Sequence, residues 1–223
     1  MPERTAQVLE LELGGERVLL HPERALICAA HRALVVADLH FGKDDAFRRS
    51  GLAWPAGAAA ADLERLAALL REYALERLVV LGDFFHAAPD PADDFFAAFR
   101  AFRAAHPRLA IEVVAGNHDR HGGLGWLAEA VTWHADGLAL GAFELRHEPG
   151  RGLLGYVLAG HLHPVAVLAA GGDRARLPVF WVRADHAVLP SFGSLTGGHP
   201  VRPARGDRLY ACTRSRVLAV PVR

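Results

Sequence analysis

Two short apolar runs, each ending in an aspartate and separated by an amphipathic segment, most constrain how this chain can fold. The runs cover residues 33–37 and 77–81; Asp38 follows the first, and Gly82 and Asp83 follow the second. Continuous apolar runs of this length are typical of strands buried on both faces of a sheet. Between them, residues 58–73 carry leucines three and four positions apart with charged residues on the opposite face, which predicts a helix. The pattern indicates a parallel βαβ unit.

The alternation of helix and strand continues as far as about residue 130. Residues 91–105 form a predicted helix whose phenylalanines fall on one stripe, and residues 109–115 form the next predicted strand. An aromatic stripe can stack nucleotide bases, but helical spacing favours packing in the core. The phenylalanines are Phe95, Phe96, Phe99 and Phe102.

Beyond about residue 130, short predicted strands replace the helices. Strands that cannot pair within a parallel βαβ layer are expected to form a second sheet packed on the first. We therefore predict an α/β fold of four layers, α/β/β/α, in which helices flank two mixed sheets. No linker-like segment interrupts the chain, so residues 1–223 are predicted to form a single domain. The predicted strands cover residues 141–146, 155–159, 165–168, 176–182, 187–189, 208–212 and 217–220.

Charge and composition exclude two classes of protein. The chain has 25 basic and 25 acidic residues, so its formal net charge is zero, and 52% of its residues are hydrophobic. This hydrophobic content excludes global disorder. A neutral chain has no long-range field that attracts phosphate, so a histone-like general binder is excluded and any nucleic acid must meet a local patch.

The cysteines and the first residues indicate a cytoplasmic protein. Cys28 and Cys212 lie in apolar stretches without metal-type spacing, which predicts buried free thiols. The first residues include an acidic side chain and no apolar segment typical of a secretory signal. Residues 152–172 lack charged side chains, but their histidines, proline and glycines favour two strands joined by a turn over a membrane span. We expect no association with a membrane.

Five polar clusters follow the ends of predicted strands, where open α/β sheets place their sites. Residues two apart in an extended segment point the same way, so Asp38 and His40 are expected to face one point, as are His161 and His163. Asp83 has two carboxylate oxygens and can bridge two ions. The clusters are Asp38-Leu39-His40, Gly82-Asp83, Gly116-Asn117-His118-Asp119, His147 and Gly160-His161-Leu162-His163.

The donor types in these clusters predict a pair of divalent metal ions. Carboxylate, amide and imidazole donors without a thiolate suit Mn²⁺, Fe²⁺, Zn²⁺, Co²⁺ or Ni²⁺ and suit Ca²⁺ or Mg²⁺ poorly. A single histidine of this kind is more often a hydrogen-bonded structural residue, but five clusters together favour a metal site. The predicted ligands are Asp38, His40, Asp83, Asn117, His147, His161 and His163.

The ordered set Asp-x-His, Gly-Asp, Gly-Asn-His-Asp, His and Gly-His-x-His resembles the calcineurin-like metallophosphoesterase superfamily. The resemblance implies that Asp83 bridges two metals and that a hydroxide between them attacks phosphorus in line. It also implies that His118 assists the leaving group or binds phosphate, with Asp119 orienting it; a hydrogen-bonding role for His118 without proton transfer stays open. The implied ligand sets are Asp38, His40, Asp83 and His163 for one metal, and Asp83, Asn117, His147 and His161 for the other.

Further segments of the sequence resemble a narrower family within this superfamily. They are His40-Phe41-Gly42-Lys43, Phe47-Arg48-Arg49-Ser50-Gly51, Leu145-Arg146-His147-Glu148-Pro149, Gly160-His161-Leu162-His163-Pro164 and the stretch 189–198. Together they resemble the bacterial ligase-associated DNA-repair metallophosphoesterases over nearly the whole chain. This resemblance implies a manganese-dependent endonuclease for single-stranded DNA, associated functionally with a DNA ligase, a helicase and an exonuclease-like protein.

Basic side chains beside the clusters are candidate substrate contacts. Lys43, Arg48 and Arg49 follow the first cluster and are placed to grip flanking phosphates, although a solvated surface is an equally good interpretation. Arg146 precedes the fourth cluster and is a further candidate. His86, three residues after the second cluster, occupies a position where many relatives have a carboxylate or an amide, and its role stays open.

Two alternative functions are weighed against the nuclease. A small-molecule phosphodiesterase or pyrophosphatase acting on cyclic nucleotides or nucleotide conjugates is favoured by the neutral charge. A non-catalytic protein-binding scaffold is disfavoured because all seven ligand positions are filled. The glycine-rich segment 191–198 can line a phosphate pocket or form a tight structural turn.

Overall fold

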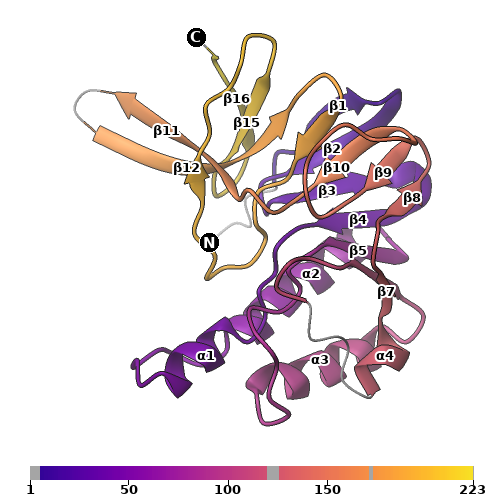
Figure 1. The fold of residues 1–223 in the computed structure, drawn as a ribbon, viewed down its shortest axis with the longest axis vertical. Helices are drawn as coiled ribbons and strands as arrows, with labels where there is room; N and C mark the ends of the chain where they lie inside the picture. The colour runs from indigo at the N-terminus through magenta and orange to yellow at the C-terminus, as the bar shows by residue number, and fades with distance from the viewer. Residues whose placement is uncertain (1–5, 120–125, 171–172, 223) are drawn as a thin grey trace.

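The computed structural model describes residues 6–119, 126–170 and 173–222. Its strands form two β-sheets that lie against each other, with the α-helices gathered beside the first sheet (Figure 1). Both sheets contain parallel and antiparallel pairs. The predicted α/β fold with two mixed sheets is confirmed.

The first sheet contains β1 (Leu9–Leu13), β2 (Glu16–His21), β3 (Ala25–Cys28), β4 (Ala33–Val36), β5 (Arg77–Leu81), β6 (Ala110–Val114) and β7 (Thr132–His134), in that order. Strands β4 to β7 pair in parallel, and β4 and β5 correspond to the two apolar runs. Every residue of β4 is buried, because helices cover one face of the sheet and the second sheet covers the other.

The antiparallel strands β1 to β3 at the start of the sheet were not predicted. Strand β1 reads Leu-Glu-Leu-Glu-Leu, a period-two alternation that is the usual signal of a half-buried strand. Gly14 and Gly15 join β1 to β2 with φ angles of 57° and 84°, which glycine adopts at little cost. This alternation before a Gly-Gly pair was the available signal for a hairpin.

The helices are α1 (Lys43–Arg49), α2 (Ala58–Glu72), α3 (Asp94–Ala105) and α4 (Trp126–Ala130), with a short 3₁₀ helix at Ala29–His31. The leucine stripe of α2 and the phenylalanine stripe of α3 share one core cluster with the first sheet. Phe95 and Phe99 are fully buried, so the prediction that this aromatic stripe packs in the core is confirmed.

The second sheet contains β8 (Leu138–Leu140), β9 (Phe143–Leu145), β10 (Tyr156–Ala159), β11 (Pro164–Ala170), β12 (Asp173–Val182), β13 (His186–Val188), β14 (His199–Pro200), β15 (Arg208–Cys212) and β16 (Val217–Val220). The order is β14-β11-β12-β13-β10-β9-β8, with β15 joined to β12 and β16 joined to β15. Leu158 and Phe180 of this sheet share a core cluster with Val35 and Val79 of the first sheet.

The predicted fourth layer is absent from the described residues. The described helices all precede residue 131, and α2, α3 and α4 pack on the first sheet. Most neighbouring strands of the second sheet are antiparallel and need only short turns, as between β8 and β9, whereas helices serve as crossovers between parallel strands. The second sheet also carries a small apolar cluster, made of Ala166, Val179, Leu209 and Ala211.

Two smaller predictions are confirmed. The uncharged segment 152–172 contains β10 and β11 with a turn between them, and no helix in the described ranges is long and apolar enough to cross a membrane. Cys28 and Cys212 are buried free thiols. Burial raises the pKa of each thiol to about 12.

Candidate metal centre

The polar clusters meet at one edge of the two sheets. Asp38, Asp83 and Asn117 follow the ends of β4, β5 and β6, and the carboxyl ends of these adjacent parallel strands lie side by side. The second sheet adds His147 and His161 from the loops after β9 and β10. A hydrogen bond links the two edges, because the main-chain N–H of His161 donates to Oδ2 of Asp38 at 3.0 Å.

One compact group contains Asp38, His40, Asp83 and His163. Each residue offers one metal-ligating atom, and these four atoms all lie within 4.8 Å of one another. Nε2 of His40 is 3.4 Å from Nε2 of His163 and 3.6 Å from Oδ2 of Asp83. Nε2 of His163 is 3.5 Å from Oδ1 of Asp38. Two donors bound to one ion at about 2.1 Å lie roughly 3 to 3.5 Å apart, so these separations suit a single divalent ion.

Asp83 also belongs to a second group, with His147 and His161. Nε2 of His147 lies 3.6 Å from Oδ1 of Asp83 and 3.0 Å from Nδ1 of His161. Asn117 joins this group, because its Oδ1 is 2.9 Å from Nε2 of His147. The two carboxylate oxygens of Asp83 therefore face different groups, which is the geometry that a bridging ligand requires.

The hydrogen bonding of the second group fits a bound cation. Nδ1 of His147 donates to the main-chain carbonyl oxygen of Leu81 at 3.0 Å, so in the neutral ring Nε2 carries a lone pair. That lone pair faces the amide oxygen of Asn117, which is also an acceptor. Asp38 and Asp83 are 0% and 2% exposed, and in the described part of the chain their ion-pair partners are histidines. Divalent cations neutralise such an arrangement, so these residues fit two metal ions.

The backbone at the predicted ligands is not extended, contrary to our expectation. The φ angles are 53° at Asp38, 50° at His40, 49° at Asp83, 69° at His161 and 44° at His163. Residues other than glycine adopt this left-handed region at a cost, and they do so mainly at functional sites. The expected convergence is found for Asp38 and His40, which share one group, with left-handed turns in place of strands. His161 and His163 do not face one point, because His163 belongs to the group of Asp38 and His161 to the group of His147.

Glycines before the ligands allow the clusters to approach closely. A Cβ at Gly82 would lie 2.0 Å from Nδ1 of His147. A Cβ at Gly116 would lie 2.4 Å from Oδ1 of Asp83. Any larger residue at either position would therefore displace one of the predicted ligands, which is the physical reason for glycine in these two clusters.

His118 lies beside both groups with its ring held in one orientation. Its Nδ1 donates to the main-chain carbonyl oxygen of His86 at 2.7 Å. Its main-chain N–H donates to Oδ1 of Asp83 at 3.0 Å. The ring is therefore positioned by a main-chain acceptor, and its backbone is attached to the carboxylate that the two groups share.

Asp119 does not orient His118, and this expectation is wrong. The Asp119 carboxylate accepts hydrogen bonds from the main-chain N–H groups of Gly116, Phe84 and Phe85 at 2.9, 3.2 and 3.0 Å. Burial raises the pKa of Asp119, while these three bonds favour its ionised form. Asp119 therefore joins the loops after β5 and β6, which carry predicted ligands.

A third group, made only of histidines, lies beside the first two and contains His40, His86 and His118. The rings of His86 and His118 are stacked, with centroids 5.7 Å apart and planes at 18°, and His40 lies 5.7 and 5.1 Å from them. Burial lowers the pKa of His40 to about 2, with contributions from His163 and His118. Burial and then Lys43 lower the pKa of His86. The ring of His86 thus stacks on His118, and the main-chain carbonyl oxygen of His86 accepts a hydrogen bond from the same residue.

The structure does not support phosphate contacts by Arg48 and Arg49. Both guanidinium groups are already paired with carboxylates on α1 and at the start of α3. The partners are Asp44, Asp45 and Asp94 for Arg48, and Asp93 for Arg49. Lys43 has no carboxylate partner among the described residues, and its Nζ lies 5.9 Å from the ring centroid of Phe47. Of the three basic side chains of α1, Lys43 is the one available to a substrate.

Arg146 lies beside the second group. It lines a cavity of about 350 Å³ together with Asn117 and His147. Its guanidinium is 3.8 Å from the carboxylate of Glu144, a long contact that leaves other donors unused. The structure therefore keeps Arg146 as a candidate substrate contact.

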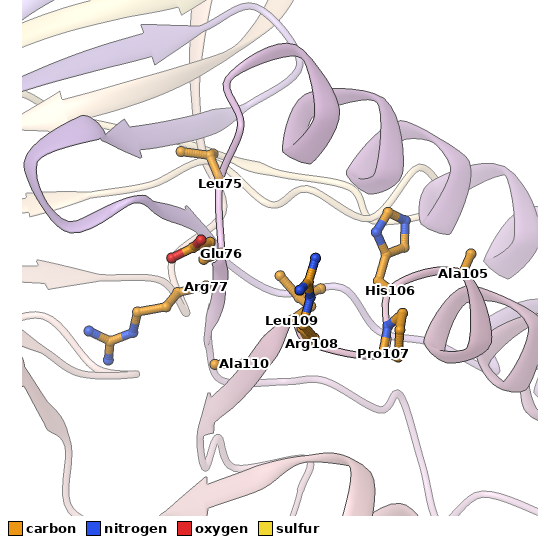
Figure 2. Close-up of a pocket in the computed structure, with 9 residues that line it drawn as sticks. All are labelled: Leu75, Glu76, Arg77, Ala105, His106, Pro107, Arg108, Leu109 and Ala110. Atoms are coloured by element: carbon orange, nitrogen blue, oxygen red, sulfur yellow. The ribbon is translucent and has the colours of Figure 1, made fainter.

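A separate cavity of about 730 Å³ lies at the opposite edge of the first sheet. Figure 2 shows it between the end of α3 and the first residues of β5 and β6, with His106 and Arg108 among its labelled side chains. Because β5 and β6 are parallel, their amino ends lie at this cavity and their carboxyl ends lie at the predicted ligands. The cavity contains none of the predicted site residues.

Two residues of α2 that were not predicted support the site. Asp62 accepts hydrogen bonds from the main-chain N–H and Oγ of Ser194, at 2.9 and 3.2 Å. Arg65 donates to the carbonyl oxygen of Phe192 at 3.0 Å and lies 4.0 Å from the centroid of its ring. The two side chains therefore hold the segment 191–198 against α2.

The segment 191–198 in turn supports a predicted ligand, because Oγ of Ser191 donates to the main-chain carbonyl oxygen of Asp38 at 2.8 Å. Of the two interpretations left open for this segment, these contacts favour a structural turn. Asp62 lies four positions before the buried Leu66, so a carboxylate stands on the apolar face of the helix. That position was the signal in the sequence for a supporting residue.

The chain is similar to known phosphoesterases in sequence and in fold. The model of the calcineurin-like phosphoesterase family matches residues 31–163. No curated protein matches the sequence. The solved structure of the nuclease MPE from Pseudomonas putida is 36% identical, with a TM-score of 0.83 over 96% of this chain and 100% of that chain. The phosphoesterase Yfce from E. coli is 14% identical, with a TM-score of 0.43 over 86% of this chain and 99% of that chain.

The matched family region covers more than half of the chain. It also contains every side chain of the two groups that share Asp83. Sequence, fold and site geometry thus agree on one assignment. The chain belongs to the calcineurin-like phosphoesterase family.

Proposed function

We propose that this protein is a metal-dependent endonuclease that cleaves single-stranded DNA in DNA repair, with Mn²⁺ as its working ion. The observation that carries the proposal is the similarity to the Pseudomonas putida nuclease MPE, which extends over 96% of this chain and 100% of that chain at 36% identity. The grouping of all seven predicted ligands around Asp83 supports the same chemistry, because it suits a two-metal phosphodiesterase.

The two groups supply the residues that would hold the ions. Asp38, His40, Asp83 and His163 would hold one, and Asp83, Asn117, His147 and His161 the other. Two bound divalent ions supply an acidified water and the positive charge that stabilises the phosphate in the transition state. The nitrogen and oxygen donors suit Mn²⁺, with Fe²⁺, Zn²⁺, Co²⁺ and Ni²⁺ as alternatives.

His118 is proposed to protonate the leaving group. Because Nδ1 donates to the carbonyl oxygen of His86, the protonated ring has an N–H at Nε2 to give to the substrate. As the P–O bond breaks, the leaving oxygen takes this proton and the ring returns to its neutral form. The hydrogen bond from the His118 main chain to Asp83 keeps the ring beside the two groups.

The test is hydrolysis of four substrates by the purified protein with Mn²⁺. The substrates are bis-p-nitrophenyl phosphate, p-nitrophenyl phosphate, single-stranded DNA and double-stranded DNA. We expect hydrolysis of the small diester and internal cleavage of single-stranded DNA. Hydrolysis of the small diester without DNA cleavage would instead support a small-molecule phosphodiesterase, and turnover of none of the four would support a scaffold.

Asp83→Ala is the matched variant, because it removes the carboxylate that the two groups share. It should abolish hydrolysis, since two ions can no longer be held at the required separation of about 3.5 to 4 Å. Asp173→Ala, which removes an exposed carboxylate at the start of β12, should behave like the unchanged protein. Near-normal activity of Asp83→Ala would contradict the two-metal assignment.

Three expectations stay predictions. One is that residues 1–223 form a single domain, which limited proteolysis of the intact protein would test. Another is a cytoplasmic location, which cell fractionation would test. The third is association with a DNA ligase, a helicase and an exonuclease-like protein, which co-purification with the tagged protein would test.

A further inference from the structure

A row of aromatic rings runs outward from the two ligand groups to the surface beside α1. The ring of Phe47, on α1, lies 6.3 Å from that of His86, which is stacked on His118. The indole of Trp54, in the loop after α1, lies 5.2 Å from the ring of Phe47. Trp54 is 40% exposed, so the outer end of this row is open to solvent.

Charge contributes little to binding along this row. The guanidinium groups of Arg48 and Arg49 are occupied by carboxylates of α1 and of the start of α3. Lys43 is the basic side chain beside the row, with Nζ at 5.9 Å from the centroid of the Phe47 ring. A polynucleotide that passes here therefore gains little from phosphate neutralisation and must gain from contact with the exposed indole of Trp54 and the half-buried ring of Phe47 behind it.

We propose that Trp54 and Phe47 form a stacking platform for an unpaired base of the strand whose phosphate is cleaved. This inference rests on the proposed function and deepens it, because it names the part of the substrate that the surface binds. Bases in a duplex are covered by their neighbours, whereas a base in a single strand presents a free face to an indole or phenyl ring. The platform is continuous with the ligand groups through His86, so it favours single-stranded over double-stranded substrates.

The experiment compares a single-stranded oligodeoxynucleotide with a copy in which the nucleotides flanking each cleavage site are abasic. Trp54→Ala should raise KM for the intact oligonucleotide about tenfold, as expected for one lost stacking contact, with little change in kcat. For the abasic copy the same variant should change neither constant. Trp54→Phe should restore most of the loss, because a phenyl ring also stacks.

Leu153→Ala is the matched control, because Leu153 is 94% exposed and lies before β10 in the other sheet. It should behave like the unchanged protein on both oligonucleotides. Equal effects of Trp54→Ala on the intact and the abasic substrate would overturn the platform. So would the absence of any effect of Trp54→Ala on the intact strand.

A binding measurement separates failure of the platform from failure of the proposed function. Fluorescence anisotropy of a labelled oligothymidylate and of its abasic copy is measured in a His118→Ala background, which keeps the predicted metal ligands. If the unchanged protein cleaves no DNA, the proposed function fails, and a preference for the intact strand that depends on Trp54 still supports the platform. If it cleaves DNA but Trp54→Ala binds both strands as tightly as before, the platform alone fails.

Discussion

Nδ1 of His118 lies 2.7 Å from the main-chain carbonyl oxygen of His86. A carbonyl oxygen can only accept, so this contact fixes a proton on Nδ1 and leaves Nε2 as the nitrogen that can exchange a proton with substrate. Because the acceptor belongs to the main chain, substitution of the His86 side chain does not remove it. The role of His118 can therefore be tested separately from that of its neighbours.

His118→Ala should slow the hydrolysis of diesters with poor leaving groups about 10²- to 10⁴-fold, the usual cost of a lost acid catalyst. Diesters of p-nitrophenol should lose much less, because p-nitrophenolate leaves without a proton. Rates on alkyl and p-nitrophenyl diesters at saturating Mn²⁺ provide the measurement. Equal losses on both would show that His118 binds phosphate instead.

Asp119→Asn should lower the free energy of unfolding by about 1 to 3 kcal/mol, because an amide NH₂ would face a main-chain N–H. The carboxylate does not contact His118, so the dependence of the rate on the leaving group should stay as it is in the unchanged protein. Urea unfolding and the same pair of diesters measure these quantities. A leaving-group dependence like that of His118→Ala would contradict the conclusion that Asp119 joins the two loops without acting on His118.

Metal removal should destabilise the protein, because Asp38 and Asp83 are buried carboxylates whose ion-pair partners in the described residues are histidines, with no lysine or arginine among them. At about 100 times its dissociation constant, each bound ion adds about 2.7 kcal/mol to the free energy of unfolding. Thermal unfolding in EDTA and in Mn²⁺ gives the comparison. Asp83→Asn should lose most of the gain with Mn²⁺ and should be more stable than the unchanged protein in EDTA. Identical Tm values with and without Mn²⁺ would exclude the proposed ion pair.

Arg65→Met should cost about 3 kcal/mol of stability, because it leaves the buried carboxylate of Asp62 without its charged partner, with only the hydrogen bonds from Ser194 remaining. It should also weaken Mn²⁺ binding, since the segment 191–198 held by Arg65 supports the main chain of Asp38. Adding Asp62→Asn should recover part of the stability. Urea unfolding and Mn²⁺ titration separate the two effects, and an unchanged Mn²⁺ affinity would reduce Arg65 to a purely structural residue.

Stability should fall as the pH rises above about 9. The native thiols of Cys28 and Cys212 keep their protons up to about pH 12, whereas in the unfolded chain a thiol ionises near 9.0. Between these pH values the unfolded state binds fewer protons than the native state, so a higher pH favours unfolding. The free energy of unfolding should fall by about 1.4 kcal/mol for each pH unit and for each thiol. Chemical unfolding at several pH values between 8 and 11 measures the slope. The double variant Cys28→Ala/Cys212→Ala should show a shallower slope, and equal slopes would refute this origin.

The local pattern of the sequence determined the central strands and the donor clusters. Residues 33–37 and 77–81 predicted strands because a continuous apolar run must be buried on both faces, and β4 and β5 lie there. Asp38 and Asp83 follow these runs, and the carboxyl ends of neighbouring parallel strands meet at one edge of the sheet. Each step depends on residues that are adjacent in the chain, so the sequence alone was sufficient.

Only the tertiary structure decided which side chain meets which partner. Arg65 reaches the carbonyl oxygen of Phe192, 127 positions away, and Arg48 reaches Asp94, 46 positions away. Asp119 binds the main chain of Phe84 in place of the neighbouring His118. The pattern of apolar residues in the sequence shows which residues must be buried, and the sequence shows which metal-ligating side chains follow each strand. The contacts among those donors form between elements that are distant in the chain and become neighbours when the helices and the two sheets pack together.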